Sequence, residues 1–266
     1  QGDKMKFVFR VALLFWAFCL SSFADGGSEN TNLINNSSIS SMGVQDVASL
    51  RGTERRIRGA AVKVISGNGH GSGTYIKYRG FNLILTAAHV TQGALGDAYE
   101  IQTRGESSVV GRLVYQDDNI DVAAILVEPI EGQNPMKYRP LDIKADVGTT
   151  TLYSGYPSDL NLMSIRGTVA GYEWTVPNGP VIMLHTYGWF GCSGSGVYDS
   201  SGRFVGILWG VSVERAYVPQ VIEDIIWVTP AHMIDETKIL QGISNLVDTS
   251  DRRTKRNIRR IMRIRI

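Results

Sequence analysis

Short apolar runs dominate the middle of the chain. From residue 60 to about residue 229, segments rich in Val, Ile, Tyr and Thr alternate with Gly, Asn and Asp. Runs of this length, bounded by turn-forming residues, predict β-strands. No helical period separates them, which favours an antiparallel sandwich or barrel. The predicted strands are 61–66, 72–78, 82–86, 98–103, 109–115, 122–127, 150–154, 162–172, 181–186, 196–198, 204–209 and 225–228.

One helix is predicted after the last strand. Thr229 is a good capping residue, and Pro230 suits the first helical turn. The apolar residues that follow recur at helical spacing as far as Val247, which predicts a helix with one buried face. They are Met233, Ile234, Ile239, Leu240, Ile243 and Leu246.

The N-terminal segment has the layout of a secretory signal peptide. Lys4, Lys6 and Arg10 precede the apolar run 11–20, and small residues at positions minus three and minus one favour cleavage after Ala24. The alternative is an anchor that stays attached and contacts the membrane, although the run is shorter than the roughly 20 residues of a membrane-spanning helix.

Changes in composition divide the chain into four parts. After the apolar run, Ser, Asn, Gly and Asp prevail, and such a segment cannot bury enough apolar surface to fold. The C-terminal tail mixes Arg with isolated aliphatic residues, which is typical of a solvated or frayed end. The expected parts are a signal peptide or membrane anchor at 1–24, a disordered linker at 25–55, a folded domain at 56–248 and a basic tail at 249–266.

Charge is unevenly distributed along the chain. The formal net charge is +2, yet residues 252–266 carry eight Lys or Arg and no acidic residue, so the rest of the chain is net acidic. An acidic folded domain does not suit nucleic-acid binding. Of the two cysteines, Cys19 lies in the segment expected to be removed, which leaves Cys192 without a disulfide partner. We therefore expect the core alone to stabilise the domain.

Three side chains of catalytic type follow one another along the chain. His89 comes directly after an apolar strand, where it can reach a cleft. Asp121 immediately precedes the buried strand 122–127, and the two aspartates before it are expected in a solvated turn. Ser193 lies between glycines that allow a tight turn. Attack of a hydroxyl on an amide needs an imidazole, a carboxylate and a serine, and these residues supply them.

The stretches LTAAHV, DNIDVAAILV and GCSGSGV resemble the three catalytic stretches of chymotrypsin-like serine proteases. The resemblance covers residues 60 to about 245. It implies an all-β fold of two six-stranded antiparallel barrels, at about 56–140 and 141–248, with the C-terminal helix after them. The short spacings and the absence of disulfides are most similar to the trypsin-like peptidases of bacteria and viruses.

The resemblance also implies a role for each catalytic residue. Ser193 is the expected nucleophile, His89 the general base and acid, and Asp121 the carboxylate that orients the imidazole. The backbone amides of Gly191 and Ser193 are the expected oxyanion hole. Ser195 is also flanked by glycines, but the spacing that matches the family is that of Ser193.

The same resemblance assigns a substrate pocket to Tyr187, Leu208, Trp209 and Gly210. Tyr187 stands where relatives that cleave after Arg or Lys have an acid, so we do not expect a preference for basic residues. Leu208 stands where the family often has a serine that supports the aspartate. Asp121 is therefore expected to accept fewer hydrogen bonds than in those relatives.

Residue 192 departs from the pattern of relatives that are made as zymogens. Those relatives have an acid before the nucleophile, which pairs with a newly cut N-terminus, whereas this chain has Cys192. We therefore expect packing to shape the site, and activity without proteolytic maturation. His185, eight residues before Ser193, is expected to be a strand residue without a role in the pocket.

These features predict a serine endopeptidase that acts on polypeptide and is secreted or periplasmic after signal cleavage. No cofactor is expected, because the four histidines are scattered and no glycine-rich phosphate loop is present. Two alternatives stay open. The chain does not start with Met, and an apolar segment before a protease also suits a membrane-anchored viral polyprotein protease. The other alternative is an inactive, peptide-binding member of the family.

Overall fold

The computed structural model describes residues 49–104, 107–143, 145–175, 179–215 and 219–249, together with Arg252 and Arg256. Gly52–Ile266 forms one compact unit, which contains both barrels. The predicted signal segment, most of the predicted linker and most of the basic tail lie outside the described residues. Within the described residues, no helix is both long and apolar enough to span a bilayer.

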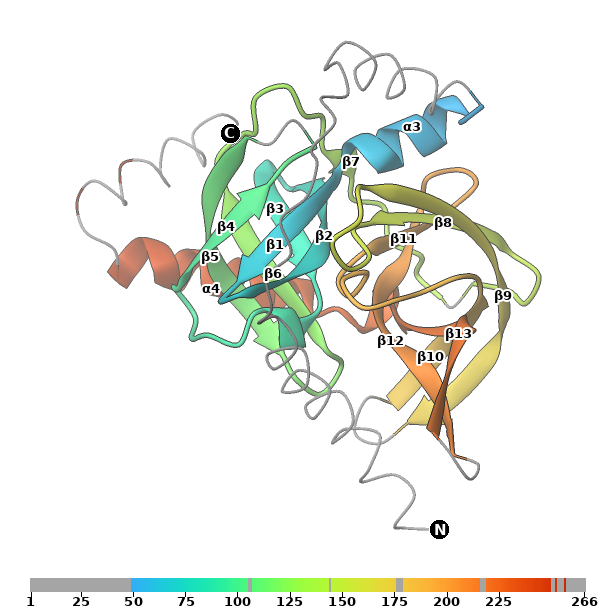
Figure 1. The fold of residues 1–266 in the computed structure, drawn as a ribbon. Coiled ribbons are helices and arrows are strands. Elements are labelled where there is room, and N and C mark those ends of the chain that lie inside the picture. The colour runs from blue at the N-terminus through green and yellow to red at the C-terminus, as the bar shows by residue number, and fades with distance from the viewer. Residues whose placement is uncertain are drawn as a thin grey trace, which may run out of the picture. The chain divides into compact units, whose positions relative to one another are not determined.

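The first barrel is closed by six antiparallel strands in the order β1-β4-β5-β6-β3-β2, because β2 also pairs with β1 (Figure 1). A seventh short strand, β7, adds to β2 in parallel. Every residue of β6 is buried, as expected for an uninterrupted apolar run. The strands are β1 (Ala61–Ser66), β2 (Gly69–Tyr78), β3 (Phe81–Thr86), β4 (Ala98–Gln102), β5 (Ser108–Asp117), β6 (Val122–Val127) and β7 (Met136–Lys137).

The second barrel is also closed by six antiparallel strands, in the order β10-β13-β12-β11-β8-β9. Closure leaves no unpaired sheet edge. The predicted fold of two six-stranded antiparallel barrels is therefore confirmed. The strands are β8 (Thr150–Gly155), β9 (Met163–Thr175), β10 (Gly179–His185), β11 (Gly196–Asp199), β12 (Phe204–Arg215) and β13 (Pro219–Pro230).

The C-terminal helix α4 (Glu236–Thr249) begins later than predicted. Thr229 and Pro230 belong to the last strand, and a single 3-10 turn, η2 (Ala231–Met233), follows them. The residue that caps α4 is Asp235. Its Oδ1 accepts hydrogen bonds from the backbone amides of Thr237 and Lys238, at 3.0 and 3.1 Å. A carboxylate at this position satisfies amides that the first helical turn leaves unpaired, so the cap at Thr229 is wrong.

The predicted apolar stripe of α4 packs against the first barrel. Ile239 and Ile243 are buried in its core, and Leu240 and Leu246 pack against it. Gly242 approaches the backbone of β5 so closely that a Cβ would overlap the carbonyl group of Val114. The helix therefore lies on a barrel that comes more than a hundred residues earlier in the chain (Figure 1).

A second helix, α3 (Gly52–Gly59), was not predicted from the sequence. Ile57 is buried in the core of the first barrel. On the other side, Glu54 forms a bidentate ion pair of 2.7 and 2.8 Å with Arg166 on β9. Arg58 donates to Ser164 on the same strand at 3.1 Å. The helix begins four residues before the predicted boundary at 56 and links the two barrels.

Candidate active site

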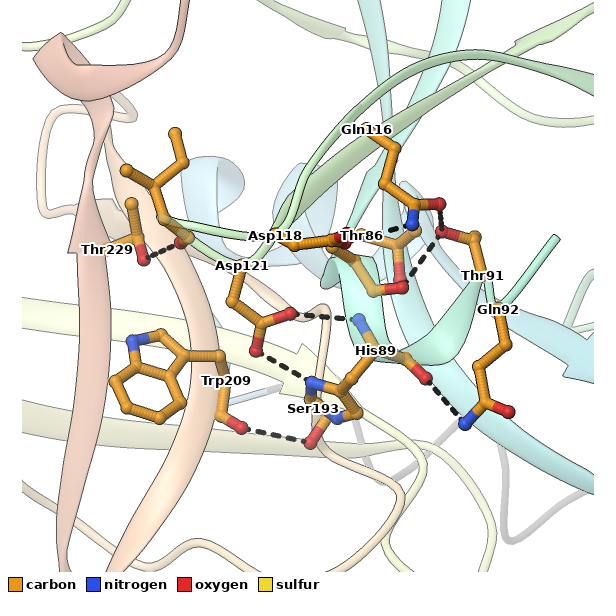
Figure 2. A network of polar contacts seen from close by, with 12 residues as sticks. Thr86, His89, Thr91, Gln92, Gln116, Asp118, Asp121, Ser193, Trp209 and Thr229 are labelled. Atoms are coloured by element: carbon orange, nitrogen blue, oxygen red, sulfur yellow. Dashed lines mark hydrogen bonds and ion pairs between the residues drawn. The ribbon is translucent and has the colours of Figure 1, made fainter. Parts of the chain in front are cut away.

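His89 lies on the 3-10 turn η1 (Ala88–Val90), three residues after the end of β3. Its backbone amide and its ring Nδ1 both bind the carboxylate of Asp121, at 2.8 and 2.7 Å (Figure 2). The His89 side chain is 41% exposed, so its other ring nitrogen can meet a ligand from solvent. Asp121 therefore fixes both the position and the tautomer of the ring.

Asp121 is held in an uncommon backbone conformation. Its φ is +54°, in the left-handed region that Asp tolerates better than most residues, and it is 8% exposed. The preceding carbonyl, that of Ile120, accepts a hydrogen bond of 2.6 Å from Thr229 on β13 (Figure 2). A buried hydroxyl from the second barrel thus fixes the turn that carries the aspartate.

The environment of His89 raises its pKa above the ordinary value of 6.5. Desolvation by burial lowers the pKa, but the charge of Asp121 and its hydrogen bond to the ring raise it by more. The protonated imidazole is therefore stabilised, as a base that must accept and hold a proton requires.

Ser193 lies in a turn shaped by two glycines with positive φ, +88° at Gly191 and +93° at Gly194. A Cβ at Gly194 would overlap the carbonyl oxygen of Ser72. The turn is bonded to both barrels, since the carbonyl of Ser193 accepts from the amide of Ser72 and the amide of Gly194 donates to Leu208, each at 2.7 Å. Only glycine combines this φ with so close an approach.

The backbone amides of Gly191 and Ser193 are not used by the hydrogen bonds that hold the turn. The carbonyl of Phe190 accepts from the amide of Ser158 at 2.7 Å, and the carbonyl of Cys192 accepts from the amide of Ser195 at 3.0 Å. In a trans peptide group the N–H points in the direction opposite to the C=O of the preceding residue. The amides of Gly191 and Ser193 therefore point elsewhere, and within the described residues neither has a backbone acceptor.

The hydroxyl of Ser193 donates to the carbonyl of Trp209, at 3.4 Å. In Figure 2 the hydroxyl of Ser193 is turned toward the carbonyl of Trp209. Among the described residues this is its one hydrogen bond, so the oxygen is not bonded to His89 in this rotamer. Ser195 is fully buried, with its hydroxyl against Gly155 and no partner among the described residues.

Cys192 is completely buried in the core of the second barrel. The hydroxyl of Tyr153 lies 3.8 Å from its sulfur and also donates to the carbonyl of Tyr187. Burial raises the pKa of the Cys192 thiol, and hydrogen bonds from Trp189 and Tyr153 lower it by less. The residue before Ser193 is therefore a neutral thiol, and a buried phenol links it to the backbone of Tyr187, six residues before Ser193.

The residues expected to form the substrate pocket are not all in one place. Tyr187 is 36% exposed, and the Trp209 ring packs against Trp227 at 5.8 Å between centroids. A Cβ at Gly210 would meet nothing within 4 Å, so this position is open. Leu208, however, is 1% exposed and points into the barrel core.

The placement of Leu208 corrects the expectation that its side chain lines the substrate pocket. A register shift between Leu208 and Gly210 turns the strand, so that Trp209 rather than Leu208 presents its carbonyl to Ser193. The expectation of fewer bonds to Asp121 stays a prediction: its carboxylate accepts from the backbone and the ring of His89, and Thr229 donates to the carbonyl before it. A side chain buried in the core neither lines a pocket nor reaches the aspartate.

Other residues near the site behave as follows. His185 is the last residue of strand β10. Its side chain is exposed, and its Nε2 lies 3.9 Å from the carboxylate oxygen Oδ2 of Asp224. Phe190 directly precedes the turn and is 47% exposed. An exposed aromatic residue at the site was not predicted from the sequence, and the only signal for it was its place directly before GCSGSG. In the part of the chain that the structure describes, no group of three or more His, Cys, Asp or Glu is arranged to hold a metal.

Residues 71–207 match the family described as the trypsin-like peptidase domain. The match covers 137 of the 266 residues, so the chain belongs to this family, and it is a serine endopeptidase with a polypeptide substrate. No curated protein sequence matches the chain.

Solved structures with the same fold include bacterial proteases. An inactive mutant form of Rv3671c from M. tuberculosis H37Rv has 16% identity and a TM-score of 0.54, over 77% of this chain and 95% of that one. The HtrA-type protease AlgW with a tripeptide has 19% identity and a TM-score of 0.59, over 72% of this chain and 62% of that one. A serine endoprotease from Yersinia pestis has 21% identity and a TM-score of 0.56, over 71% of this chain and 66% of that one.

These similarities establish the fold. The chain spans less than two thirds of AlgW and of the Yersinia endoprotease, whereas it spans nearly all of the Rv3671c chain.

Proposed function

We propose that the chain hydrolyses peptide bonds through Ser193, His89 and Asp121. The observation that carries the proposal is the pair of short bonds, 2.7 and 2.8 Å, by which Asp121 holds the ring and the backbone of His89. The Ser193 turn approaches the chain just before His89, since a Cβ at Gly194 would lie 3.0 Å from the backbone nitrogen of Ala87. The amides of Gly191 and Ser193 have no backbone acceptor among the described residues. Together they provide a base, a nucleophile and a site for the oxyanion.

In the proposed mechanism, substrate binding moves the Ser193 hydroxyl from Trp209 to the free nitrogen of His89, by rotation to another staggered rotamer. Catalytic hydrogen bonds are often loose before substrate binds. His89 Nε2 takes the proton as the oxygen attacks the carbonyl carbon, and Asp121 stabilises the imidazolium. The amides of Gly191 and Ser193 hold the oxyanion.

The intermediate then collapses to an acyl-enzyme. His89 gives its proton to the leaving amine, the C–N bond breaks, and the acyl group stays on Ser193 as an ester. Water attacks the ester with His89 again as base, which releases the acid and restores the serine. Each proton taken by His89 is returned in the same half-reaction, so no cofactor is needed.

We further propose that the turn is competent without proteolytic maturation. The bonds from Ser72 and Ser158 hold its peptide groups, and buried Cys192 stands where an ion-pairing acid would be. A protein extended at its N-terminus should therefore cleave peptide as fast as one trimmed to residue 49. A lag that ends only on trimming would contradict this.

The N-terminal segment carries a separate proposal. We propose secretion or export to the periplasm with cleavage after Ala24, and the alternative is a membrane-anchored segment of a viral polyprotein. Intact mass of the mature protein decides between them. A chain that begins at residue 25 supports export, and one that retains the apolar segment in the membrane fraction supports the anchor.

The experiment that tests the mechanism is a peptide-library cleavage profile of the wild type, Ser193→Ala and Ser195→Ala. We expect Ser193→Ala to lose turnover by at least about 10³-fold and Ser195→Ala to keep it. Loss of turnover in Ser195→Ala alone would overturn the assignment. A folded wild type that binds peptides but cleaves none would identify a non-catalytic member of the family.

A further inference from the structure

The leaving side of a substrate has a defined path in this site. Ser193 is bonded to both barrels, through its hydroxyl to Trp209 on β12 and through its carbonyl to Ser72 on β2. If the acyl part of the substrate pairs with the open strand at Trp209 and Gly210, the residues after the scissile bond must leave on the opposite side. That side is the start of β2.

Two polar residues of the first barrel face this path. Lys63 on β1 lies directly opposite Ser72, and His70 lies two residues before Ser72 on β2. Since alternate residues of a strand share a face, all three side chains lie on the same side of the sheet. Ser72 shows which side this is, because its hydroxyl donates to the carbonyl of Gly191 at 2.7 Å and accepts from the amide of Tyr156 at 2.9 Å.

His70 adjoins the oxyanion residue directly. A Cβ at Gly191 would lie 3.1 Å from its Nε2, and that nitrogen lies 3.1 Å from the carbonyl oxygen of Tyr156. A carbonyl only accepts, so Nε2 carries the proton, and Nδ1 has no partner among the described residues. Burial lowers the pKa of His70, and the bond to Tyr156 raises it by less. Smaller effects come from Lys63, which lowers the pKa, and from Asp159, which raises it.

Lys63 is a half-buried cation that lacks a carboxylate. Its Nζ lies 5.3 Å from the centroid of the Tyr156 ring, and within the described residues no acidic oxygen lies within 4.0 Å of it. Tyr156 is only 7% exposed, and its hydroxyl has no partner among the described residues. A half-buried cation without an anion is costly, and a bound anion would relieve this deficit.

The surroundings of Tyr156 add positive charge. Burial raises the pKa of its hydroxyl, and the guanidinium groups of Arg58 and Arg104 lie close enough to lower it. The acid nearest to His70 in its electrostatic surroundings is Asp159, which is exposed. The potential beside the path therefore favours an anion.

From this juxtaposition we infer that Lys63, held over the Tyr156 ring on the same side of the sheet as His70, is the cation of a subsite for a carboxylate of the substrate, within the first few residues after the scissile bond. The inference rests on the proposed function, because it places the scissile bond over Ser193. A carboxylate can belong to an Asp or Glu side chain or to the C-terminus of the substrate. An endopeptidase requires the side chain, so this is the source to which the subsite is assigned.

The test uses internally quenched peptides with a mapped cleavage position that differ only in the residues after it. Glu at the favoured position should raise kcat/KM about fivefold over Gln, since a partly screened ion pair contributes about that factor. Lys63→Met should abolish the preference, Lys63→Arg should keep it, and Lys137→Met, a change at an exposed lysine on β7, should leave it intact. Peptides with free and amidated C-termini distinguish the two sources of carboxylate.

A short aryl-amide substrate with no residue after the scissile bond shows whether Lys63 acts on the reaction itself. Its turnover should be equal in the wild type and Lys63→Met, and a parallel loss would mean a merely structural role and overturn the inference. An unchanged Glu-to-Gln ratio in Lys63→Met would overturn it as well. If the folded wild type cleaves nothing, the proposed function fails, and anisotropy binding of the Glu and Gln peptides to Ser193→Ala still tests the subsite.

Discussion

The two halves of the site are held by different forces. On the first barrel, His89 is fixed by a carboxylate through two charge-assisted bonds, one to its ring and one to its backbone. On the second barrel, the Ser193 turn contains no charged side chain and is held by backbone bonds, two glycines with positive φ and the buried Cys192. The first half should therefore respond to charge and pH, and the second to volume and shape.

The largest expected effect comes from the charged half. Asp121→Asn should lower kcat/KM by about 10³- to 10⁴-fold, because the imidazole loses its tautomer control and its counter-charge. Since Asp121 raises the pKa of His89 and the neutral ring is the base, the acid limb of the pH–rate profile should move to lower pH. A profile with an unmoved acid limb would break the comparison, since His89 would then not depend on Asp121.

The shape-dependent half should fail when its glycines gain a side chain. Gly194→Ala should lower the free energy of unfolding by about 3 kcal/mol, because it adds left-handed strain to an overlap with Ser72. Gly59→Ala, whose Cβ would meet nothing within 4 Å, is the matched control and should fold normally. Chemical denaturation followed by tryptophan fluorescence measures both. A Gly194→Ala variant as stable as Gly59→Ala would contradict the geometry of the turn.

The hydroxyl of Tyr153 offers a finer test of the same half. Tyr153→Phe leaves the carbonyl of Tyr187 without its donor and removes the phenol oxygen beside the Cys192 thiol, so we expect a loss of about 1 kcal/mol in stability. If this bond positions the turn, kcat should fall with little change in KM. Tyr138→Phe is the control, because the Tyr138 hydroxyl has no partner among the described residues. Equal stability and equal kcat in the two variants would contradict a role of the Tyr153 hydroxyl in positioning the turn.

The strand pattern predicts an antiparallel sandwich or barrel, because the strands are short, apolar and bounded by turn residues, which are local signals. That there are two barrels is what the family resemblance implies. The sequence also predicts the order of His89, Asp121 and Ser193. It does not predict the contacts between distant segments that place these residues. Thr229 was expected to cap a helix, yet it binds the carbonyl before Asp121, since Asp235 is the better cap.

Leu208 and α3 illustrate the same limit. A single register shift on β12 turns Leu208 into the core and Trp209 toward Ser193, and no local pattern marks it. The helix α3 has one buried apolar residue and is stabilised by its ion pair with β9, so its own sequence carries little helical signal. The link between Tyr153 and Cys192 joins segments 39 residues apart and could be found only in the fold.

The smallest effect on activity is expected outside both halves. Asp199 accepts bonds from Ser201 and Arg203 in the turn before β12. Burial raises the pKa of its carboxyl, but these bonds lower it by more. A lowered pKa stabilises the fold above the ordinary carboxyl range, and the contribution is lost as pH falls through the lowered pKa. Asp199→Asn should therefore cost about 1 kcal/mol at pH 7 and nothing in strong acid, with kcat unchanged.

The central claim is that Ser193 is a nucleophile on a turn that needs no maturation. Its most direct test is to treat the full, untrimmed chain with a fluorophosphonate and to locate the adduct by peptide mass spectrometry. We predict one adduct, on Ser193, that is kept in Ser195→Ala and lost in Ser193→Ala and, for lack of a base, in His89→Ala. An adduct on Ser195, or none on the folded chain until its N-terminus is trimmed, would contradict the account.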